Sequence, residues 1–247
     1  MIPLRDDNPT RRRAVVTLAL IAINVGVYFW VQPNTGDVAR SSEFTYSHAA
    51  IPCEVTTNEP LSVEELQTDT CNELPEGAPI FPHKNVWLAV LISMFLHGSL
   101  LHLGGNMLFL WIFGNNIEDH LGAVKYLAFY LVGGLFATGA HILTDPSSTV
   151  PVVGASGAIA AVMGAYLAWF PNVRIKTLFI FFFIMFRDIS AKWLLLFWFV
   201  TQFFDAVNPN SGVAWAAHVG GFAFGLLAGW IMRSLSGGPR PARAGSY

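Results

Sequence analysis

The sequence predicts an all-α membrane protein with six transmembrane helices and a large first outer loop. Of its 247 residues, 53% are hydrophobic and only 12% are charged, whereas soluble domains carry about a quarter charged residues. The mean hydropathy is +0.49. Crossing a bilayer takes about 17 to 25 apolar residues, and suitable runs lie near 14–31, 99–117, 122–143, 152–170, 189–206 and 213–232.

The first apolar run follows a cluster of arginines, Arg5 and 11–13, and no small-residue cleavage site comes after it. A secretory signal peptide would carry such a site. We therefore expect a cytoplasmic N-terminus over 1–13 and an uncleaved first transmembrane helix over 14–31.

An extracytoplasmic loop is expected over 32–98. Its first part, 32–85, is rich in Pro, Ser, Thr, Glu and Asp, and its apolar residues are too sparse for an independent core. This part is either an extramembrane cap or partly disordered. The apolar end, 86–98, is expected to lie embedded in protein or in the membrane interface, because the second helix begins near Ser99.

Both cysteines of the chain, Cys53 and Cys71, lie in this loop. They can form one disulfide if the loop faces an oxidising compartment, and they are two free thiols if it does not. Neither cysteine resembles part of a metal site. The sequence leaves the two alternatives open.

The remaining five helices form a core over 99–232. Within it, 174–187 holds ten apolar residues between cations, which is too short for a membrane-spanning helix, so we expect an interfacial connector on the cytoplasmic side. The aromatic-rich segment 193–204 is expected to face lipid. The tail 233–247, rich in Gly, Pro and Arg, is expected to be cytoplasmic and disordered.

Charge predicts the orientation. With six alternating spans, twelve Lys and Arg residues fall on the side of the N-terminus and only Arg40 and Lys84 fall on the other. Cytoplasmic segments carry an excess of Lys and Arg, so both termini are expected in the cytoplasm and the protein in the cell membrane, plasma or inner. The sequence shows no basic patch for nucleic acid, and it does not indicate an oligomeric state.

Four polar side chains within the predicted spans are candidates for function: Ser156, His218, His102 and Asn106. Polar groups are costly inside a bilayer and are often functional there. Each one alone also has another explanation: serine and asparagine can serve helix packing, and a histidine can be a proton relay or a ligand contact. Their combination favours catalysis.

Ser156 and His218 are expected about four and five residues into two spans that both enter from the outer side. At about 1.5 Å per residue, both would lie about 6–8 Å below their helix starts. Small residues let helices approach closely, and they occur in both spans, at Gly154, Gly157, Ala160 and Gly164 and at Gly221, Gly225 and Gly229.

A serine hydroxyl needs a base before it can act as a nucleophile, and an imidazole is the usual one. No acidic residue lies at this depth, so a Ser156–His218 pair without a third member is expected. His102 and Asn106 are four residues apart and share a helix face. Together with the backbone N–H of Ser156, their N–H groups can stabilise an oxyanion. His97 is expected to be structural and to shape the outer loop.

The motifs His97–Asn106 (HGSLLHLGGN), Gly154–Gly157 (GASG) and Ala217–Phe222 (AHVGGF) together resemble the rhomboid family of intramembrane serine proteases. The similarity runs from about Trp87 to Trp230. It implies a six-helix rhomboid bundle with Ser156 as nucleophile, His218 as base, and His102 and Asn106 as oxyanion donors. It also implies transmembrane protein substrates cut near the outer face of the lipid bilayer, with no metal or diffusible cofactor.

Two further positions can be compared with the pattern of the family. Many relatives carry a Trp-Arg pair in the first outer loop, where this chain has Trp87 and Leu88. The acidic residue of the family after the second helix corresponds to Glu118, which we expect to be structural.

Two other functions remain as alternatives. The first is an inactive rhomboid-like factor that binds membrane clients, which the intact serine, histidine and glycine set disfavours. The second is a small transporter that uses His102 and His218 for proton coupling. The absence of inverted repeats and of broken-helix pairs in the sequence disfavours the transporter.

Overall fold

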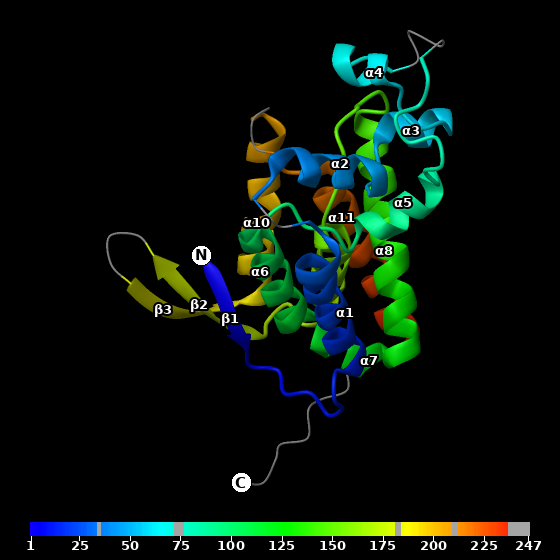
Figure 1. Cartoon of the computed structure of the whole chain (residues 1–247). Helices are drawn as coiled ribbons and strands as arrows, with labels where there is room; N and C mark the ends of the chain where they lie inside the picture. Colours follow the sequence, from blue (N-terminus) through cyan, green and yellow to red (C-terminus); the bar gives the residue numbers. More distant parts are fainter. Residues whose placement is uncertain (34–35, 72–76, 181–183, 209–211, 237–247) are drawn as a thin grey trace, which may run out of the picture.

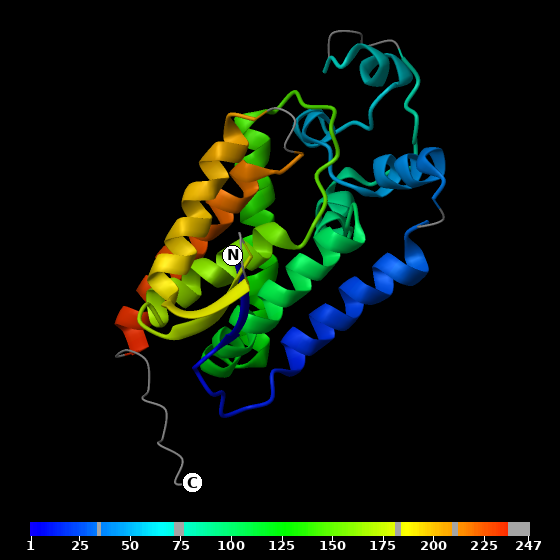
Figure 2. The same cartoon turned by 90° about the vertical axis from the view of Figure 1, so that its left-hand side faces the viewer.

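The computed structural model of the chain describes residues 1–33, 36–71, 77–180, 184–208 and 212–236. Long helices lie side by side, and shorter helices cap them at one end (Figures 1 and 2). We call each continuous run of helical residues a rod. The first rod consists of α1 (Val15–Gly26) and the π-helical turn η1 (Val27–Val31) that follows it. The second joins α6 (Leu100–Phe109), η2 (Leu110–Gly114) and α7 (Asn115–Leu121).

Four further rods are single long helices: α8 (Ala123–Thr144), α9 (Ser156–Trp169), α10 (Ala191–Ala206) and α11 (Trp215–Ser236). Over the described ranges, two helices are long and apolar enough to cross a membrane, Ala123–Thr144 and Trp215–Leu235. Val15–Val31 and Ser156–Trp169 are apolar but shorter. The chain is therefore mostly helical as expected, and a bundle of six membrane-spanning helices stays a prediction.

Helix α9 forms the centre of the core. Almost all of its residues after Ser156 are buried, and it packs most extensively against α11 and then α8. The contact with α11 is backbone to backbone, because a Cβ added at Gly225 would lie 1.8 Å from the carbonyl oxygen of Ala161. At Gly221 it would lie 2.3 Å from that of Gly157. The small-residue face predicted for this helix pair is present.

The described part of the outer loop is more ordered than the sequence suggested. It contains α2 (Val38–His48), α3 (Pro52–Thr57), α4 (Val63–Thr68) and α5 (Val86–Ser93). A disulfide joins Cys53 to Cys71, and Ile51, Cys53 and Leu61 form a small buried cluster of their own. The expectation that this loop has no core was therefore wrong, because a crosslink lets few apolar residues hold together.

A buried ion pair also holds the loop. Lys84 Nζ lies 2.5 Å from a carboxylate oxygen of Glu54, and both side chains are almost fully buried. Burial raises the pKa of Glu54, an effect that the hydrogen bond from Lys84 opposes. The carboxylate of Glu54 also accepts a hydrogen bond from the backbone N–H of Leu61, so the pair connects α3 to the segments on either side of α4.

This outer cap is attached to the segment that leads into α9. The backbone N–H of Val152 donates to the carbonyl of Ala50, and the N–H of Cys53 donates to the carbonyl of Ser148. The N–H of Ala50 donates in turn to Ser93 Oγ at the end of α5. The cap therefore fixes the position at which the chain enters α9.

The all-α expectation fails at the other end of the molecule. Residues expected to form a connector fold into strands β2 (Arg174–Ile180) and β3 (Ile184–Ser190). Strand β1 (Ile2–Asp6) pairs with β2 and completes an antiparallel sheet in the order β1-β2-β3. The cause is the alternation in β2, where Ile175 and Thr177 are buried while Arg174 and Lys176 are exposed.

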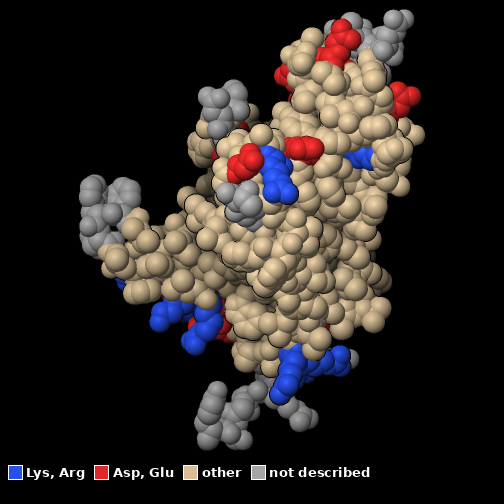
Figure 3. Space-filling view, in the orientation of Figure 1, with Lys and Arg blue, Asp and Glu red and all other residues tan. Residues whose placement is uncertain are grey.

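The end of the molecule near α7 and the sheet carries most of the Lys and Arg visible in Figure 3, and most of the Asp and Glu lie at the capped end. Near α7, the carboxylate of Glu118 accepts hydrogen bonds from the backbone N–H groups of Val16 and Thr17 at the start of α1. Glu118 thus caps α1, in line with the structural role expected for it.

Helix α11 ends at Ser236, four residues beyond the predicted end of the core at 232. The first residues of the expected disordered tail are therefore helical, because Arg233 anchors them by donating to the carbonyl of Ala168. The rest of that tail, 237–247, lies outside the described residues.

Candidate active site

Ser156 is the first residue of α9, and Ala155 is its N-cap. The expectation that it lies four residues into a helix was wrong, because 152–155 is not helical. Gly154 adopts a φ of 126°, where a side chain would be strained, and a Cβ there would lie 2.8 Å from His102 Nε2. The chain enters α9 through this non-helical segment, and Ser156 is nevertheless in contact with His218.

His218 is the fourth residue of α11. Its Nε2 lies 2.8 Å from Ser156 Oγ, which is hydrogen-bonding distance. The close approach of α9 and α11 makes this contact possible, since Gly157 packs against Ala137 of α8 and against Ala217, the neighbour of His218. Serine and histidine, predicted to meet across this helix pair, do so.

The other ring nitrogen of His218 has a partner that the sequence analysis missed. Its Nδ1 lies 2.6 Å from Oε1 of Gln202 on α10. Gln202 is 4% exposed, and the ring of Trp198 lies 5.7 Å from that of His218. The expectation that 193–204 simply faces lipid was therefore wrong for these two residues. A glutamine within an apolar span was the available signal.

His102 and Asn106 lie one turn apart on α6, and Ser99 caps this helix by accepting from the N–H of His102. Asn106 is buried, and its Nδ2 has no hydrogen-bond partner in the part of the chain that the structure describes. His97 exchanges backbone hydrogen bonds with the side chain of Gln32, and its ring packs 5.1 Å from that of His102. His97 therefore connects the end of η1 to the start of α6.

A cavity of about 210 Å³ brings the four predicted residues together. Its remaining lining is almost entirely apolar and comes from α6, α9 and α10, with Leu101, Gly105, Phe109, Ile159, Met163 and Trp198. An apolar surrounding strengthens hydrogen bonds to a developing charge. The cavity thus holds a serine, a base in contact with it and two N–H-bearing side chains.

A family comparison identifies this architecture: residues 84–235 match the model of the Rhomboid domain. The chain belongs to the rhomboid family. The resemblance carried by the three sequence motifs is therefore confirmed. The matched range contains the four predicted site residues, which line the cavity, and also Gln202.

Curated rhomboid relatives match in the same way. The chain is 32% identical over 157 residues to rhomboid protein 1, mitochondrial, of Saccharomyces cerevisiae, a match that covers 59% of this chain and 42% of the yeast protein. It is 31% identical over 147 residues to the human presenilin-associated rhomboid-like protein, mitochondrial, covering 56% and 36%. It is 26% identical over 222 residues to the rhomboid protease GlpG of Photorhabdus laumondii, covering 88% and 61%. The chain thus spans less than half of the length of these mitochondrial relatives.

Where many rhomboid relatives carry a Trp-Arg pair, this chain has Trp87 and Leu88, and both lie exposed on α5. The indole of Trp87 donates to Asn58 Oδ1 in the outer loop. A tether between α5 and the loop therefore exists here, and it starts from Trp87, the residue beside Leu88.

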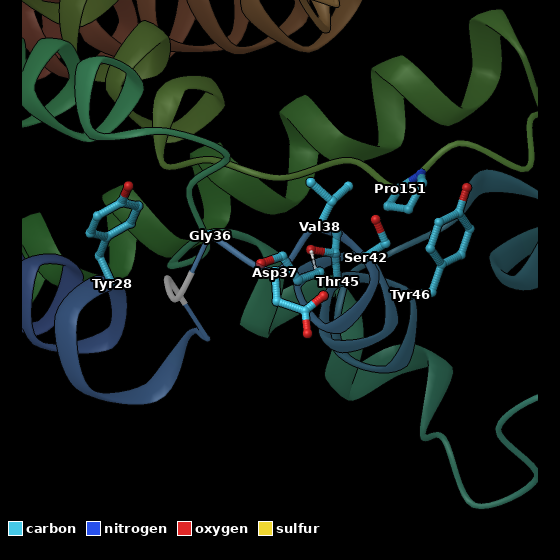
Figure 4. Close-up of a pocket in the computed structure, with 9 residues that line it drawn as sticks. Tyr28, Gly36, Asp37, Val38, Ser42, Thr45, Tyr46 and Pro151 are labelled. Carbon is cyan, nitrogen blue, oxygen red and sulfur yellow. Dashed lines mark hydrogen bonds between the residues drawn. The ribbon is translucent and has the colours of Figure 1, made fainter.

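A second hollow, of about 490 Å³, lies at the capped end between α2, the end of the first rod and Pro151 (Figure 4). Hydroxyl groups line it, including those of Tyr28, Ser42, Thr45 and Tyr46. None of the four residues of the candidate active site is among its lining residues, so this hollow is separate from the serine.

Proposed function

We propose that this rhomboid protein is an intramembrane serine endopeptidase that cleaves transmembrane substrates near the outer membrane face through a Ser156–His218 dyad. The observation that carries the proposal is the 2.8 Å contact between Ser156 Oγ and His218 Nε2 inside an apolar cavity. A rhomboid-like client-binding factor would not need that contact.

The proposed chemistry begins at Ser156. Nε2 of His218 takes the hydroxyl proton as Oγ forms a bond to the scissile carbonyl carbon. His218 then gives this proton to the leaving amine as the C–N bond breaks, which leaves an acyl group on Ser156. Water, deprotonated by the same imidazole, attacks the acyl carbon. The C–Oγ bond then breaks as His218 returns the proton to Oγ, which releases the acid product and regenerates the serine.

The oxyanion of each tetrahedral intermediate would be held by three donors. The backbone N–H of Ser156 opens α9 and so has no partner within the helix. The carboxamide of Asn106 and an N–H of His102 line the same cavity. The positive end of the α9 dipole adds to their effect.

The proposed side of cleavage follows from the attachment of the site to the cap. The segment 148–152, which leads to Ser156, is hydrogen-bonded to the outer loop around α3. The excess of Lys and Arg at the opposite end supports an orientation with both termini in the cytoplasm. We retain the cell membrane as the proposed location, although several relatives bear mitochondrial names.

Labelling by a serine-reactive fluorophosphonate tests the proposal in detergent. The parent protein should be labelled and should cleave a model transmembrane substrate, whereas Ser156→Ala and His218→Ala should do neither. Ser42→Ala serves as the matched control, because Ser42 is an exposed serine on α2. A parent that neither labels nor cleaves would favour the client-binding function instead.

A further inference from the structure

We propose that Gln202 is a positioning residue that holds His218 in the one tautomer able to accept the proton of Ser156. This inference rests on the proposed roles of Ser156 and His218. Its basis is a continuous hydrogen-bonded path from α10 to the serine. Gln202 Oε1 lies 2.6 Å from His218 Nδ1, and His218 Nε2 lies 2.8 Å from Ser156 Oγ.

The orientation of the Gln202 amide is fixed by its own helix. Its Nε2 donates to the carbonyl oxygen of Trp198 at 3.0 Å and to Thr201 Oγ1 at 3.2 Å. Thr201 gives its own hydroxyl proton to the same Trp198 carbonyl at 2.6 Å, so its oxygen is left to accept. Both neighbours of the amide nitrogen are therefore acceptors, and the amide oxygen must face His218.

The fixed amide determines the histidine tautomer. An amide oxygen carries no proton, so the hydrogen of the bond to His218 must sit on Nδ1. In a neutral imidazole the other nitrogen then has a free lone pair. That nitrogen is Nε2, which faces Ser156. The hydrogen bond to Gln202 therefore leaves the lone pair of Nε2 free to accept the proton of Ser156, as a general base requires.

The reversed amide is disfavoured by the same groups. Turning Gln202 over would place its oxygen against the carbonyl of Trp198 and its N–H₂ against His218. A buried carbonyl left without a donor costs about 1–3 kcal/mol. It would also impose the tautomer with a proton on Nε2, and that nitrogen could no longer take the serine proton.

A neutral acceptor suits this environment. Gln202 is 4% exposed, and an ionised carboxylate there would require compensation for its lost hydration. A carboxylate would stabilise an imidazolium more strongly, as in triads that contain aspartate. Glutamine supplies the orientation without burying a charge, which explains how this chain manages without an acidic third member.

The tautomer can be observed directly by nitrogen NMR of the protein labelled with ¹⁵N-histidine, with His218 assigned by comparison with His218→Ala. We expect a protonated Nδ1 and an unprotonated Nε2 in the parent. In Gln202→Met, which removes the acceptor at similar size, the protonated Nδ1 should no longer be the single form. A protonated Nε2 in the parent, or an unchanged spectrum in Gln202→Met, would overturn the proposal.

Kinetics supply the second test. Gln202→Met should lower kcat by about 10–100-fold, the range found when partners that orient metal-bound histidines are removed, with KM little changed. Gln202→Glu in its neutral, protonated form keeps an oxygen acceptor toward His218 and a donor toward the carbonyl of Trp198, so it should recover most of the loss. Gln67→Met makes the same chemical change at an exposed position of α4 and should behave as the parent.

Parental kcat in Gln202→Met, or Gln202→Glu as slow as Gln202→Met, would contradict the assignment. A parent with no activity would refute the proposed protease function. The NMR comparison would then still decide the role of Gln202, because it needs no turnover.

Discussion

Asn106 carries a buried amide group whose hydrogens have no partner within the described residues. Leaving a buried donor unpaired costs about 1–3 kcal/mol. Proteins retain such a cost where the donor has a partner only during function. Asn106 lines the cavity that contains Ser156 Oγ, so under the proposed function the partner that it would meet is the oxygen of a bound substrate.

Replacing Asn106 by Ala should separate activity from stability. We expect Asn106→Ala to lower kcat by about 10²–10³-fold, as for the loss of other oxyanion donors. The thermal unfolding temperature in detergent should stay the same or rise slightly, since no hydrogen bond is lost. An unchanged cleavage rate in a folded Asn106→Ala protein would remove it from the oxyanion role.

The sequence identified the residues of the site better than their surroundings. Ser156, His218, His102 and Asn106 stand out as polar groups in apolar segments, and the structure brings them to one cavity. Gln202 follows the same rule, but the aromatic residues around it suggested a lipid-facing segment. Which side of a helix faces inward depends on its neighbours in space, and a uniformly apolar helix does not reveal this in its sequence.

Helices α9 and α11 touch through their backbones at Gly225. A Cβ at Gly225 would meet the carbonyl oxygen and the Cα of Ala161 at distances too short for any side-chain contact. These are main-chain atoms of a buried helix, and they cannot move aside as a flexible side chain can. The separation of Ser156 and His218 depends on this spacing, because they lie on the two helices.

Gly225→Ala should therefore force the two helices apart. We expect a loss of stability of about 1–3 kcal/mol or more, typical of overpacked cores, and a loss of fluorophosphonate labelling. Gly139→Ala is the matched control, since a Cβ there meets nothing within 4 Å and helix interiors favour alanine over glycine. Equal thermal stability of the two variants in detergent would show that α9 and α11 are not held at this spacing.

The helices were easier to anticipate than the sheet. Long apolar runs predicted the positions of the rods, but their ends shifted by several residues at α9 and α11 because hydropathy does not mark helix caps. Strand β2 has a clear two-residue alternation, yet its pairing partners are β3 and the distant β1. Pairing across such a separation cannot be seen in local sequence.

Asp6 ties the sheet to the helical bundle. Its carboxylate accepts hydrogen bonds from Tyr166 Oη on α9 at 2.6 Å and from Asn116 Nδ2 on α7 at 2.7 Å. Burial raises the pKa of Asp6 to about 6, and the two hydrogen bonds only partly offset this effect. The free energy of unfolding is therefore coupled to the protonation of Asp6.

The sign of the resulting pH dependence follows from linkage. The folded protein holds the Asp6 proton up to about pH 6 and the unfolded chain only up to its ordinary pKa of 3.8. Stability from this group is complete below about pH 4 and is lost as pH rises through 6, by about 3 kcal/mol. Asp6→Asn removes the titration and keeps an oxygen acceptor for Tyr166.

Unfolding free energies measured from pH 4 to 7 should therefore show a difference between parent and Asp6→Asn that moves in favour of the variant as pH rises. Because the difference between two proteins is compared, titration of the other carboxylates cancels. Parallel pH profiles for parent and variant would contradict a buried, proton-holding Asp6.

The cap that Glu118 places on α1 has a consequence for biosynthesis. Glu118 follows Thr17 by 101 positions and accepts from both its N–H and its hydroxyl. While the ribosome is still making the intervening chain, the first turn of α1 lacks this acceptor. We therefore expect the start of α1 to stay at the hydrated membrane surface until the second rod arrives, so the burial of the first helix is completed by a residue translated long after it.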